Sequence, residues 1–378
     1  MKKISLMLQP AVGTKTGIGW YAYNLTKELC DANKNKYIGE VFNFHRKNLN
    51  EIKILNLFIK ENTFLPYRLL KILNRFINYN FLTKSNSDIY HFFDYSILKR
   101  IEGKVILTIH DLIPFLFPEL CPTLYEEKAK NIFYNNIKYG IERGNIIITV
   151  SEYSKQEILK YFKIDSNKVK IVSPGIYLDE YLKDYFEKKQ KVKEKYNLPE
   201  NFILFLGALE PKKNISNIIR GFEMYKFLNI KSDIKLIIAG GKGWKYEEIF
   251  KVYEQSKYKN DIKFIGYINE EEKIPLYKLA KLFIFPSLYE GFGMPVLEAM
   301  AAGVPVITSN VSSLPEVAGE GAILVNPNSV EEISKAIEKI IDGNKEFVEK
   351  MIKEGKKQAE KYTWEKSARK MEEIYEEL

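Results

Sequence analysis

Short apolar runs alternate with helix-like stretches along the whole chain of 378 residues. Several runs are continuously apolar, for example 146–148 within 145–150, and 202–206. Strands that are buried on both faces have this composition, and a regular strand–helix alternation is typical of parallel sheets covered by helices. The alternation occurs twice, so the sequence predicts an α/β chain of two doubly wound, Rossmann-like domains.

The boundary between the two domains is expected at residues 177–199, where the chain becomes charged and poor in core residues and ends at Pro199. We interpret this stretch as a linker. It separates an N-terminal domain at 1–176 from a C-terminal domain at 200–362. The charged, helical stretch at about 363–378 is expected to pack back on the first domain.

The composition points to a reducing compartment. The two cysteines, Cys30 and Cys121, fit no metal-ligand spacing and are interpreted as buried thiols. The apolar run 4–8 is too short for a signal peptide, and no stretch approaches the ~20 apolar residues of a membrane span. We expect a cytoplasmic protein, at most peripheral on the inner face of a membrane.

Most of the net charge of +9 comes from one segment, 46–84, which has eight Lys or Arg against two Glu. The same segment has apolar residues at helical spacing, as in 69–77. A basic amphipathic helix of this kind can lie on anionic lipid. The alternative is a helix packed on the core with a solvated basic face.

The stretch 285–303 has the most distinctive chemistry. Its apolar run ends like a buried strand, and Gly291 and Gly293 then expose backbone N–H groups. Pro295 suits the first turn of the helix that follows. Glu290 is therefore expected on the loop and Glu298 in the first helical turn, which suits a ligand with hydroxyls and an anionic group.

Three other stretches follow predicted strands, at the edge where ligands of doubly wound sheets bind. Gly17 to Ala22 matches G-x-G-x-x-A, which suits a phosphate at a helix N-terminus, although a simple flexible turn has the same composition. His110-Asp111 ends a strand and is either catalytic or a structural pair, whereas His91 is expected in the core. Lys212 and Lys213 precede a helix and are either a cation pair for a diphosphate or ordinary surface lysines.

Together these residues suit a nucleotide that carries a diphosphate and a sugar. We expect no metal site and no cofactor, because the sequence has no Asp-x-Asp and no cluster of metal ligands. The diphosphate charge would be met by Lys212, Lys213 and helix N-termini.

The sequence resembles the retaining glycosyltransferases of family 4, which have the GT-B fold. The Glu-x7-Glu motif at Glu290 and Glu298, in its Gly-Phe-Gly-Met-Pro setting, is the most specific match. Supporting matches are the glycine loop, His110-Asp111, 150–154, Pro174-Gly175, 207–214 and 314–319. The form Glu-Pro-Lys-Lys-Asn is similar to the mannosyltransferase-like branch, which usually has arginine at the position of Lys212. Lysine meets a phosphate as a point charge but not bidentately.

The resemblance implies a function and a set of roles. The enzyme would move a hexose, with mannose as the leading candidate, from a nucleotide diphosphate sugar to a glycan or lipid-linked acceptor in polysaccharide or lipopolysaccharide synthesis. The implied catalytic residues are His110, Asp111 and Glu290. The implied contacts to the diphosphate are Gly17, Gly19, Lys212 and Lys213. The implied contacts to the transferred sugar are Gly291, Phe292, Gly293 and Met294, and the implied contact to the ribose is Glu298.

Other functions stay open at this point. A nicotinamide-dependent oxidoreductase is suggested by the glycine pattern, but about eight residues intervene between the first strand and Gly17. A nucleic-acid-binding protein is suggested by the basic composition, but no recognition motif accompanies it and we expect no nucleic-acid partner. A sugar-binding relative without turnover is a further alternative. The donor base, the donor sugar, the acceptor and the oligomeric state are not predicted.

Overall fold

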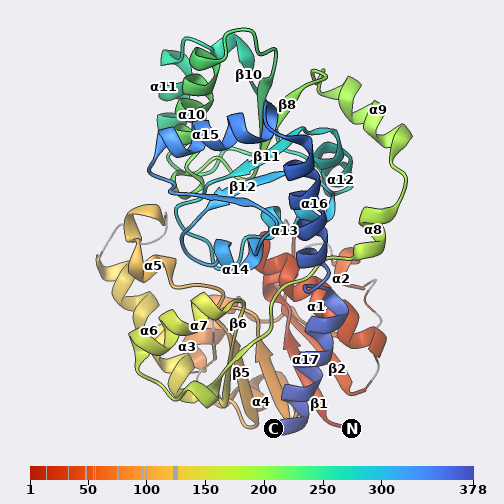
Figure 1. Cartoon of the computed structure of the whole chain (residues 1–378). Coiled ribbons are helices and arrows are strands. Elements are labelled where there is room, and N and C mark those ends of the chain that lie inside the picture. Colours follow the sequence, from red (N-terminus) through yellow and green to blue (C-terminus); the bar gives the residue numbers. More distant parts are fainter. Residues whose placement is uncertain are drawn as a thin grey trace. The chain divides into compact units, whose positions relative to one another are not determined.

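The structure is a computed structural model of the whole chain. It describes residues 1–378 except 14, 33, 47–48, 54, 56, 75, 96, 99 and 122–126, and of residues 51, 67, 68, 71, 127–130, 132 and 133 only the backbone. The chain divides into two compact units (Figure 1). The first unit comprises Met1–Gly175 and Trp364–Leu378, and the second comprises Ile176–Thr363.

The first unit is built on one parallel sheet. Its strands are apolar because helices cover both faces of the sheet, as in Ile89–Phe92, where every residue is buried. Among the described residues the sheet has seven strands, which in spatial order are β3 (Phe58–Asn62), β2 (Lys36–Phe42), β1 (Lys3–Met7), β4 (Ile89–Phe92), β5 (Lys104–Thr108), β6 (Ile146–Thr149) and β7 (Val169–Ile171).

Helices connect these strands and close the unit. The α-helices are α1 (Gly17–Ala32), α2 (Asn50–Lys53), α3 (Tyr67–Leu73), α4 (Tyr79–Thr83), α5 (Ile113–Leu116), α6 (Glu127–Arg143), α7 (Glu152–Phe162) and α17 (Trp364–Glu377). Short 3-10 helices are η1 (Gln9–Ala11), η2 (Pro118–Leu120) and η4 (Ser166–Lys168). Ser151 caps α7, as its sequence predicts, by accepting a hydrogen bond from Ser154 N at 3.1 Å.

The C-terminal helix α17 packs against α1 and is tied to the first sheet by buried polar contacts. The fully buried His91 on β4 lies 2.7 Å from the Tyr375 hydroxyl through Nδ1 and 2.9 Å from Thr108 Oγ1 through Nε2. Glu372 accepts a hydrogen bond from Asn35 at 2.7 Å. His91 is thus a core residue, as predicted, and α17 belongs to the first unit.

The second unit repeats the architecture with a six-stranded parallel sheet among its residues. The spatial order is β10 (Ile262–Gly266), β9 (Lys235–Ala239), β8 (Phe202–Leu206), β11 (Leu282–Phe285), β12 (Val306–Ser309) and β13 (Ile323–Val325). Its helices are α8 (Leu178–Leu182), α9 (Phe186–Lys195), α10 (Ile215–Leu228), α11 (Glu247–Gln255), α12 (Glu270–Leu279), α13 (Met294–Ala301), α14 (Leu314–Ala318), α15 (Val330–Ile341) and α16 (Lys345–Ala359), with 3-10 helices η5 (Pro211–Lys213) and η6 (Lys259–Asp261).

The predicted fold class is therefore confirmed: each unit is a doubly wound, Rossmann-like α/β domain. Cys30 and Cys121 are buried thiols, as predicted. The stretch 177–199, interpreted as a linker, forms α8 and α9 within the second unit. It is held there because α9 packs on α12 and Lys278 Nζ donates to the Tyr181 carbonyl at 2.7 Å.

The segment 46–84 differs from the expectation. A continuous amphipathic helix over 69–77 was predicted, but α3 ends at Leu73, and the edge strand β3 within the segment was not predicted. Asn74 ends the helix because its side chain bonds the carbonyls of Ile77 (3.2 Å) and Arg100 (3.1 Å). The basic side chains of Arg68, Lys71 and Arg75 lie outside the described residues.

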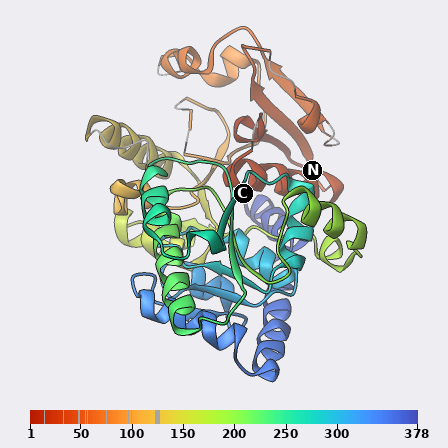
Figure 2. The same cartoon turned by 90° about the horizontal axis from the view of Figure 1, so that it is seen from above.

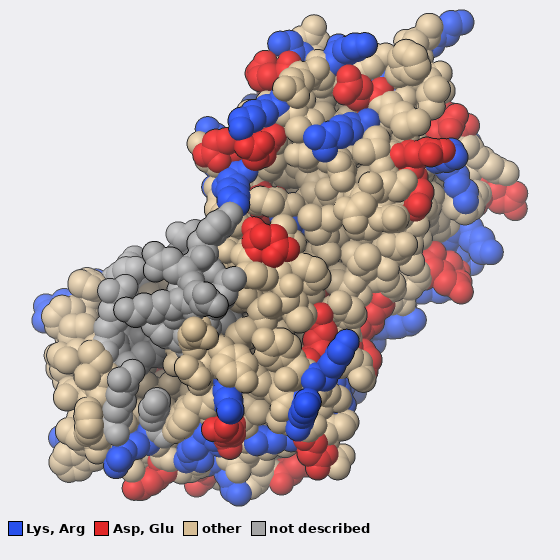
Figure 3. Space-filling view, turned by 90° about the vertical axis from the view of Figure 1, so that its left-hand side faces the viewer, with Lys and Arg blue, Asp and Glu red and all other residues tan. Residues whose placement is uncertain are grey.

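Two surface properties bear on the class of partner. Among the described residues, no helix combines the length and the apolar character needed to cross a membrane. On the face drawn in Figure 3, the coloured Lys and Arg side chains are interspersed with Asp and Glu. This face presents mixed charge rather than a basic stripe of the kind that tracks a nucleic-acid backbone.

Gly240 provides a test of the second sheet's packing. A Cβ at Gly240, whose φ is +144°, would lie 1.8 Å from the Gly207 carbonyl oxygen, whereas a Cβ at Gly241 would meet nothing within 4 Å. We expect Gly240→Ala to lower the free energy of unfolding of the second unit by about 2–5 kcal/mol. Gly241→Ala is the matched control and should change it by less than about 1 kcal/mol. Equal denaturation midpoints for the two variants would contradict this packing.

Candidate active site

The loop that joins β11 to α13 is fixed by hydrogen bonds to the next loop of the sheet. Glu290 N donates to Ser312 Oγ at 3.1 Å, and Ser313 Oγ lies 2.9 Å from the Glu290 carbonyl oxygen. Ser313 Oγ also lies 2.8 Å from the carbonyl of Phe292. The backbone on both sides of Gly291 is therefore held before any ligand binds.

Helix α13 begins where the sequence predicts. Gly293 has φ +110° and a Cβ there would lie 2.6 Å from Leu314, so this position requires glycine. Pro295 follows in the first turn. The positive end of the helix dipole thus lies directly after the Glu290 loop. The Phe292 side chain is buried, and its ring packs edge-on against Tyr362 at 5.2 Å.

Glu290 and Lys213 form an ion pair at the carboxyl ends of two adjacent strands, β11 and β8. Lys213 Nζ lies 2.5 Å from Glu290 Oε1, and each side chain is only 11% exposed. Ser287 Oγ donates to the same oxygen at 2.7 Å, and Lys213 Nζ stands 4.9 Å from the centre of the Phe285 ring. Glu290 Oε2 has no hydrogen-bond partner among the described residues, so one carboxylate oxygen can accept from a ligand.

The charge state of Glu290 follows from these contacts. Burial by itself would raise the pKa of this carboxyl, but the positive charges of Lys213 and Lys212 and the hydrogen bonds from Lys213 and Ser287 outweigh it. The pKa lies below the ordinary value for glutamate. Glu290 is therefore a carboxylate at neutral pH, and it cannot act as a general acid.

Lys212 is held on the same side of the sheet through its backbone. Its carbonyl accepts from Leu288 N at 2.7 Å and lies 2.8 Å from Ser287 Oγ, and its ammonium lies 3.6 Å from Glu210. Asn214 then joins three loops, because its Nδ2 donates to the carbonyls of Pro286 (3.0 Å) and Pro327 (2.6 Å). These contacts fix the backbone that carries both lysines at the strand ends.

Glu298 was expected in the first turn of this helix, but it is the fifth residue of α13 and lies in the second turn. Its Oε2 accepts a hydrogen bond from the Tyr277 hydroxyl at 2.9 Å. Burial raises the pKa of Glu298, and the nearby Glu270 adds to the rise, while Lys273 and the Tyr277 hydrogen bond oppose it. Glu298 was predicted as a site residue from the sequence, whereas Tyr277, Lys273 and Ser287 were not. Of these, only Ser287 lay in a stretch that the motif marked.

In the first unit, His110 lies two residues beyond the end of β5. Its Nε2–H donates to the Phe93 carbonyl at 3.0 Å, and the Tyr21 ring meets it edge-on at 4.9 Å. Burial lowers the pKa of His110 to about 4, although the hydrogen bond to Phe93 opposes this. The imidazole is therefore neutral at pH 7. Its Nδ1 is left as an acceptor, with no partner among the described residues.

Asp111 has a local structural contact. Its Oδ1 accepts from Ile113 N at 3.1 Å, at the start of the short helix α5. For Asp111, this contact agrees with the structural interpretation of the His110-Asp111 pair.

Gly17 and Gly19, which were expected in a loop, lie in the first turn of α1 and have different surroundings. A Cβ at Gly19 would lie 2.5 Å from the Pro10 carbonyl oxygen, so Gly19 lets α1 pack against η1. A Cβ at Gly17 would meet nothing within 4 Å. Gly17 is thus the glycine whose backbone is open to a ligand.

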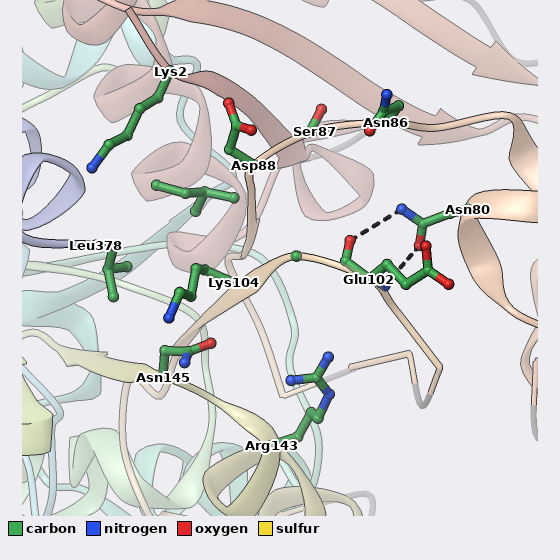
Figure 4. A pocket seen from close by; sticks show the side chains of 12 residues that line it. Lys2, Asn80, Asn86, Ser87, Asp88, Glu102, Lys104, Arg143, Asn145 and Leu378 are labelled. Atoms are coloured by element: carbon green, nitrogen blue, oxygen red, sulfur yellow. Dashed lines mark hydrogen bonds between the residues drawn. The ribbon is translucent and has the colours of Figure 1, made fainter.

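A large polar cavity of about 900 Å³ lies elsewhere in the first unit (Figure 4). It is at the amino ends of β1, β4, β5 and β6, where Lys2, Asp88, Lys104 and Asn145 line it. Figure 4 shows Asn80 bonded to the backbone of Glu102 at its rim. None of the predicted site residues lines it, and it is at the edge of the sheet opposite to the one where doubly wound folds bind ligands.

Comparisons with known proteins agree with this architecture. A sequence model described as Glycosyl transferases group 1 matches residues 186–358, and one described as Glycosyltransferase Family 4 matches residues 15–180. The O-antigen chain mannosyltransferase B of Escherichia coli is 29% identical and covers 96% of both chains. The Escherichia coli serotype-specific mannosyltransferase WbdA is 32% identical over 71% of this chain, which spans 33% of WbdA.

Solved structures show the same fold. The crystal structure of Anabaena Alr3699/HepE in complex with UDP and glucose has a TM-score of 0.77 and covers 100% of both chains, at 16% identity. WaaG, a glycosyltransferase involved in lipopolysaccharide biosynthesis, has a TM-score of 0.69 and covers 99% of both chains. The two sequence models together match most of the chain, one in each unit, and the chain belongs to the glycosyltransferases of the GT-B fold that they describe.

Proposed function

We propose that this enzyme transfers a hexose, with mannose as the leading candidate, from a nucleotide diphosphate sugar to a glycan or lipid-linked glycan acceptor, with retention of anomeric configuration. The support for mannose and for a surface polysaccharide such as O antigen is the similarity to O-antigen chain mannosyltransferase B and to WbdA. The support for a nucleotide sugar is the chemistry of the second unit.

The Lys213–Glu290 pair carries this proposal. A buried ion pair is costly to desolvate and is poor evidence for stability, so its position at the ends of β8 and β11 suggests a role in binding. A diphosphate that reaches Lys213 adds negative charge beside an ammonium that is already held in place. Lys212 supplies a second cation on the same side, and the α13 N-terminus supplies a dipole.

The remaining roles follow from the chemistry of each group. We assign the backbone of Gly291, Phe292, Gly293 and Met294, with the open Oε2 of Glu290, to the hydroxyls of the transferred sugar. Glu298 is assigned to the ribose hydroxyls. From the first unit, we assign the neutral His110 to a hydroxyl of the reacting sugar and the open backbone of Gly17 to the diphosphate. Asp111 orders the backbone after His110, and Gly19 allows α1 to pack.

The proposed reaction is a transfer on one face of the sugar. The bond from the anomeric carbon to the diphosphate oxygen breaks, and its electron pair stays on the diphosphate. The acceptor oxygen attacks the anomeric carbon from the same face, and its proton passes to the leaving diphosphate oxygen. Because Glu290 is ionised and bound to Lys213, the protein's part is to stabilise charge and position groups rather than to supply a proton.

The two lysines and the helix N-terminus supply the positive charge that the leaving diphosphate needs. We therefore propose that transfer proceeds without a divalent cation. If the acceptor is the lipid-linked glycan of these two classes, the enzyme works at a membrane surface.

A thermal-shift screen of nucleotide sugars tests the function. A true donor stabilises the folded protein by mass action, by about 2.7 kcal/mol at a hundred times its Kd. We expect GDP-mannose or another nucleoside diphosphate hexose to raise Tm in the presence of EDTA, and free mannose to have no effect. If no nucleotide sugar or nucleoside diphosphate shifts Tm, the proposed donor site is wrong.

Glu298→Ala should raise the donor KM by roughly ten- to a hundredfold, because hydrogen bonds from hydroxyls to a charged carboxylate are worth about 1.5–3 kcal/mol. Tyr277→Phe is the matched control, since it removes the same internal hydrogen bond but keeps the carboxylate. Steady-state kinetics with varied donor measures both variants. The ribose assignment fails if Glu298→Ala has the KM of the wild type.

Lys213→Ala should reduce kcat/KM by roughly 10²- to 10³-fold, because one preorganised charge on the leaving group is worth about 2.7–4 kcal/mol. Lys335→Ala is the control: it removes an exposed ion pair with Glu331 on α15. Thermal melting of both variants separates loss of function from loss of fold. Unchanged kcat/KM in a folded Lys213→Ala protein would remove the observation on which the proposal rests.

A further inference from the structure

Exposed apolar side chains gather in one short segment of the first unit. Of the eighteen large apolar side chains that are exposed among the described residues, eight belong to residues 44–81, about a tenth of the chain. We call these eight the aromatic surface: Phe44, Phe58, Phe64, Leu69, Ile72, Phe76, Ile77 and Phe81. Phe81, Phe76 and Phe58 are the most open of them, at 79%, 74% and 69% exposed.

We propose that the aromatic surface docks the first unit onto the headgroup region of an anionic lipid bilayer. Aromatic side chains favour this region because their rings are partly desolvated there without entering the hydrocarbon core. Only the purpose of the docking, which is to bring the enzyme to a lipid-linked acceptor, rests on the proposed function. The binding itself is a property of the surface.

The supporting structure holds these side chains outward. Leu70 and Tyr79 are fully buried in the core of the first unit, and Tyr79 donates its hydroxyl to the buried Glu40 on β2. Leu69 and Ile72 lie three positions apart on α3, so they share the side of that helix that faces solvent, and Phe76 is exposed in the turn after the helix. They are exposed because the opposite side of the same turns is anchored in the core.

The position of the segment suits an interaction surface. Strand β3 is the last strand at one edge of the sheet, and Figure 2 shows this orange part of the chain along one edge of the view. Phe44 and Phe64 each lie two residues beyond the end of their strand, as His110 does beyond β5. Because parallel strands end at the same edge, one end of the aromatic surface lies at the edge of the sheet that carries His110.

The net positive charge of residues 46–84 favours an anionic binding partner. Residues 46–84 carry eight Lys or Arg against two Glu. Of the described side chains, Arg46, Lys53 and Lys84 are exposed. Basic residues near a bilayer are attracted to anionic lipid over about one Debye length, so they need not lie in the plane of the aromatic rings. A second copy of this chain would bring like charges together, which disfavours it as the occupant.

Vesicle sedimentation tests the proposal directly. The wild-type enzyme should sediment with large unilamellar vesicles of phosphatidylglycerol and phosphatidylcholine in equal parts, and much less with phosphatidylcholine alone. Phe76→Asp/Phe81→Asp should lower partitioning by roughly tenfold or more. Phe227→Asp/Ile230→Asp is the matched control, because Phe227 and Ile230 are as exposed, at 69% and 78%, but lie in and just after the last turn of α10 in the second unit. It should bind like the wild type.

A variant that reverses two basic residues tests the contribution of charge to vesicle binding. Lys53→Glu/Lys84→Glu should also weaken binding to the anionic vesicles by roughly tenfold or more. No sedimentation of the wild type, wild-type binding by Phe76→Asp/Phe81→Asp, or equal binding to neutral vesicles would overturn the proposal. So would a dimer in light scattering that Phe76→Asp/Phe81→Asp dissociates.

Binding to vesicles is expected to be independent of the donor site. Phe76→Asp/Phe81→Asp should keep the wild-type Tm and the wild-type rate of transfer to a water-soluble acceptor. If the wild type transfers no sugar but sediments as expected, the proposed function fails and the docking surface stands. If it transfers sugar but does not sediment, the reverse holds.

Discussion

The buried pair of Lys213 and Glu290 is the interaction on which the chemistry of the second unit depends. Each group alone would be a costly buried charge, and together they are held by Ser287 and by the loops that Asn214 joins. The pair fixes an ionised carboxylate with one open oxygen next to a fixed ammonium. That arrangement suits a ligand with hydroxyls on one side and negative charge on the other, and it argues against a glycosidase-like pair of acid and base.

Much of the fold could be predicted from the sequence, because strands that are buried on both faces are continuously apolar. The runs that became β8 and β11 are of this kind. Strand β3 was missed for the opposite reason: it is an edge strand with the polar sequence Phe-Ile-Lys-Glu-Asn, so burial imposes little pattern on it. The helices within 177–199 were missed because most of α9 is solvated and charged.

The candidate site shows a similar division. Glu290, Lys212 and Lys213 were found because a glycine turn or a strand end marks them. Tyr277 was not, since a tyrosine on a helix has no local signature and its role depends on α12 meeting α13 at Glu298. The different roles of Gly17 and Gly19 could not be predicted from the sequence, because they depend on the surroundings of each residue. Gly19 packs closely against Pro10, whereas the backbone at Gly17 is open. The exposure of Phe76 and Phe81 could not be predicted from the sequence either, since periodic apolar residues ordinarily indicate a buried face.

The anomeric configuration of the product tests the central claim most directly. With an α-linked nucleotide sugar as donor and EDTA in the reaction, the glycoside formed can be identified by proton NMR before any other step acts on it. Charge-stabilised transfer on one face, assisted by the leaving diphosphate, predicts an α-linked product at an undiminished rate. A β-linked product, or a reaction that EDTA abolishes, would contradict the account.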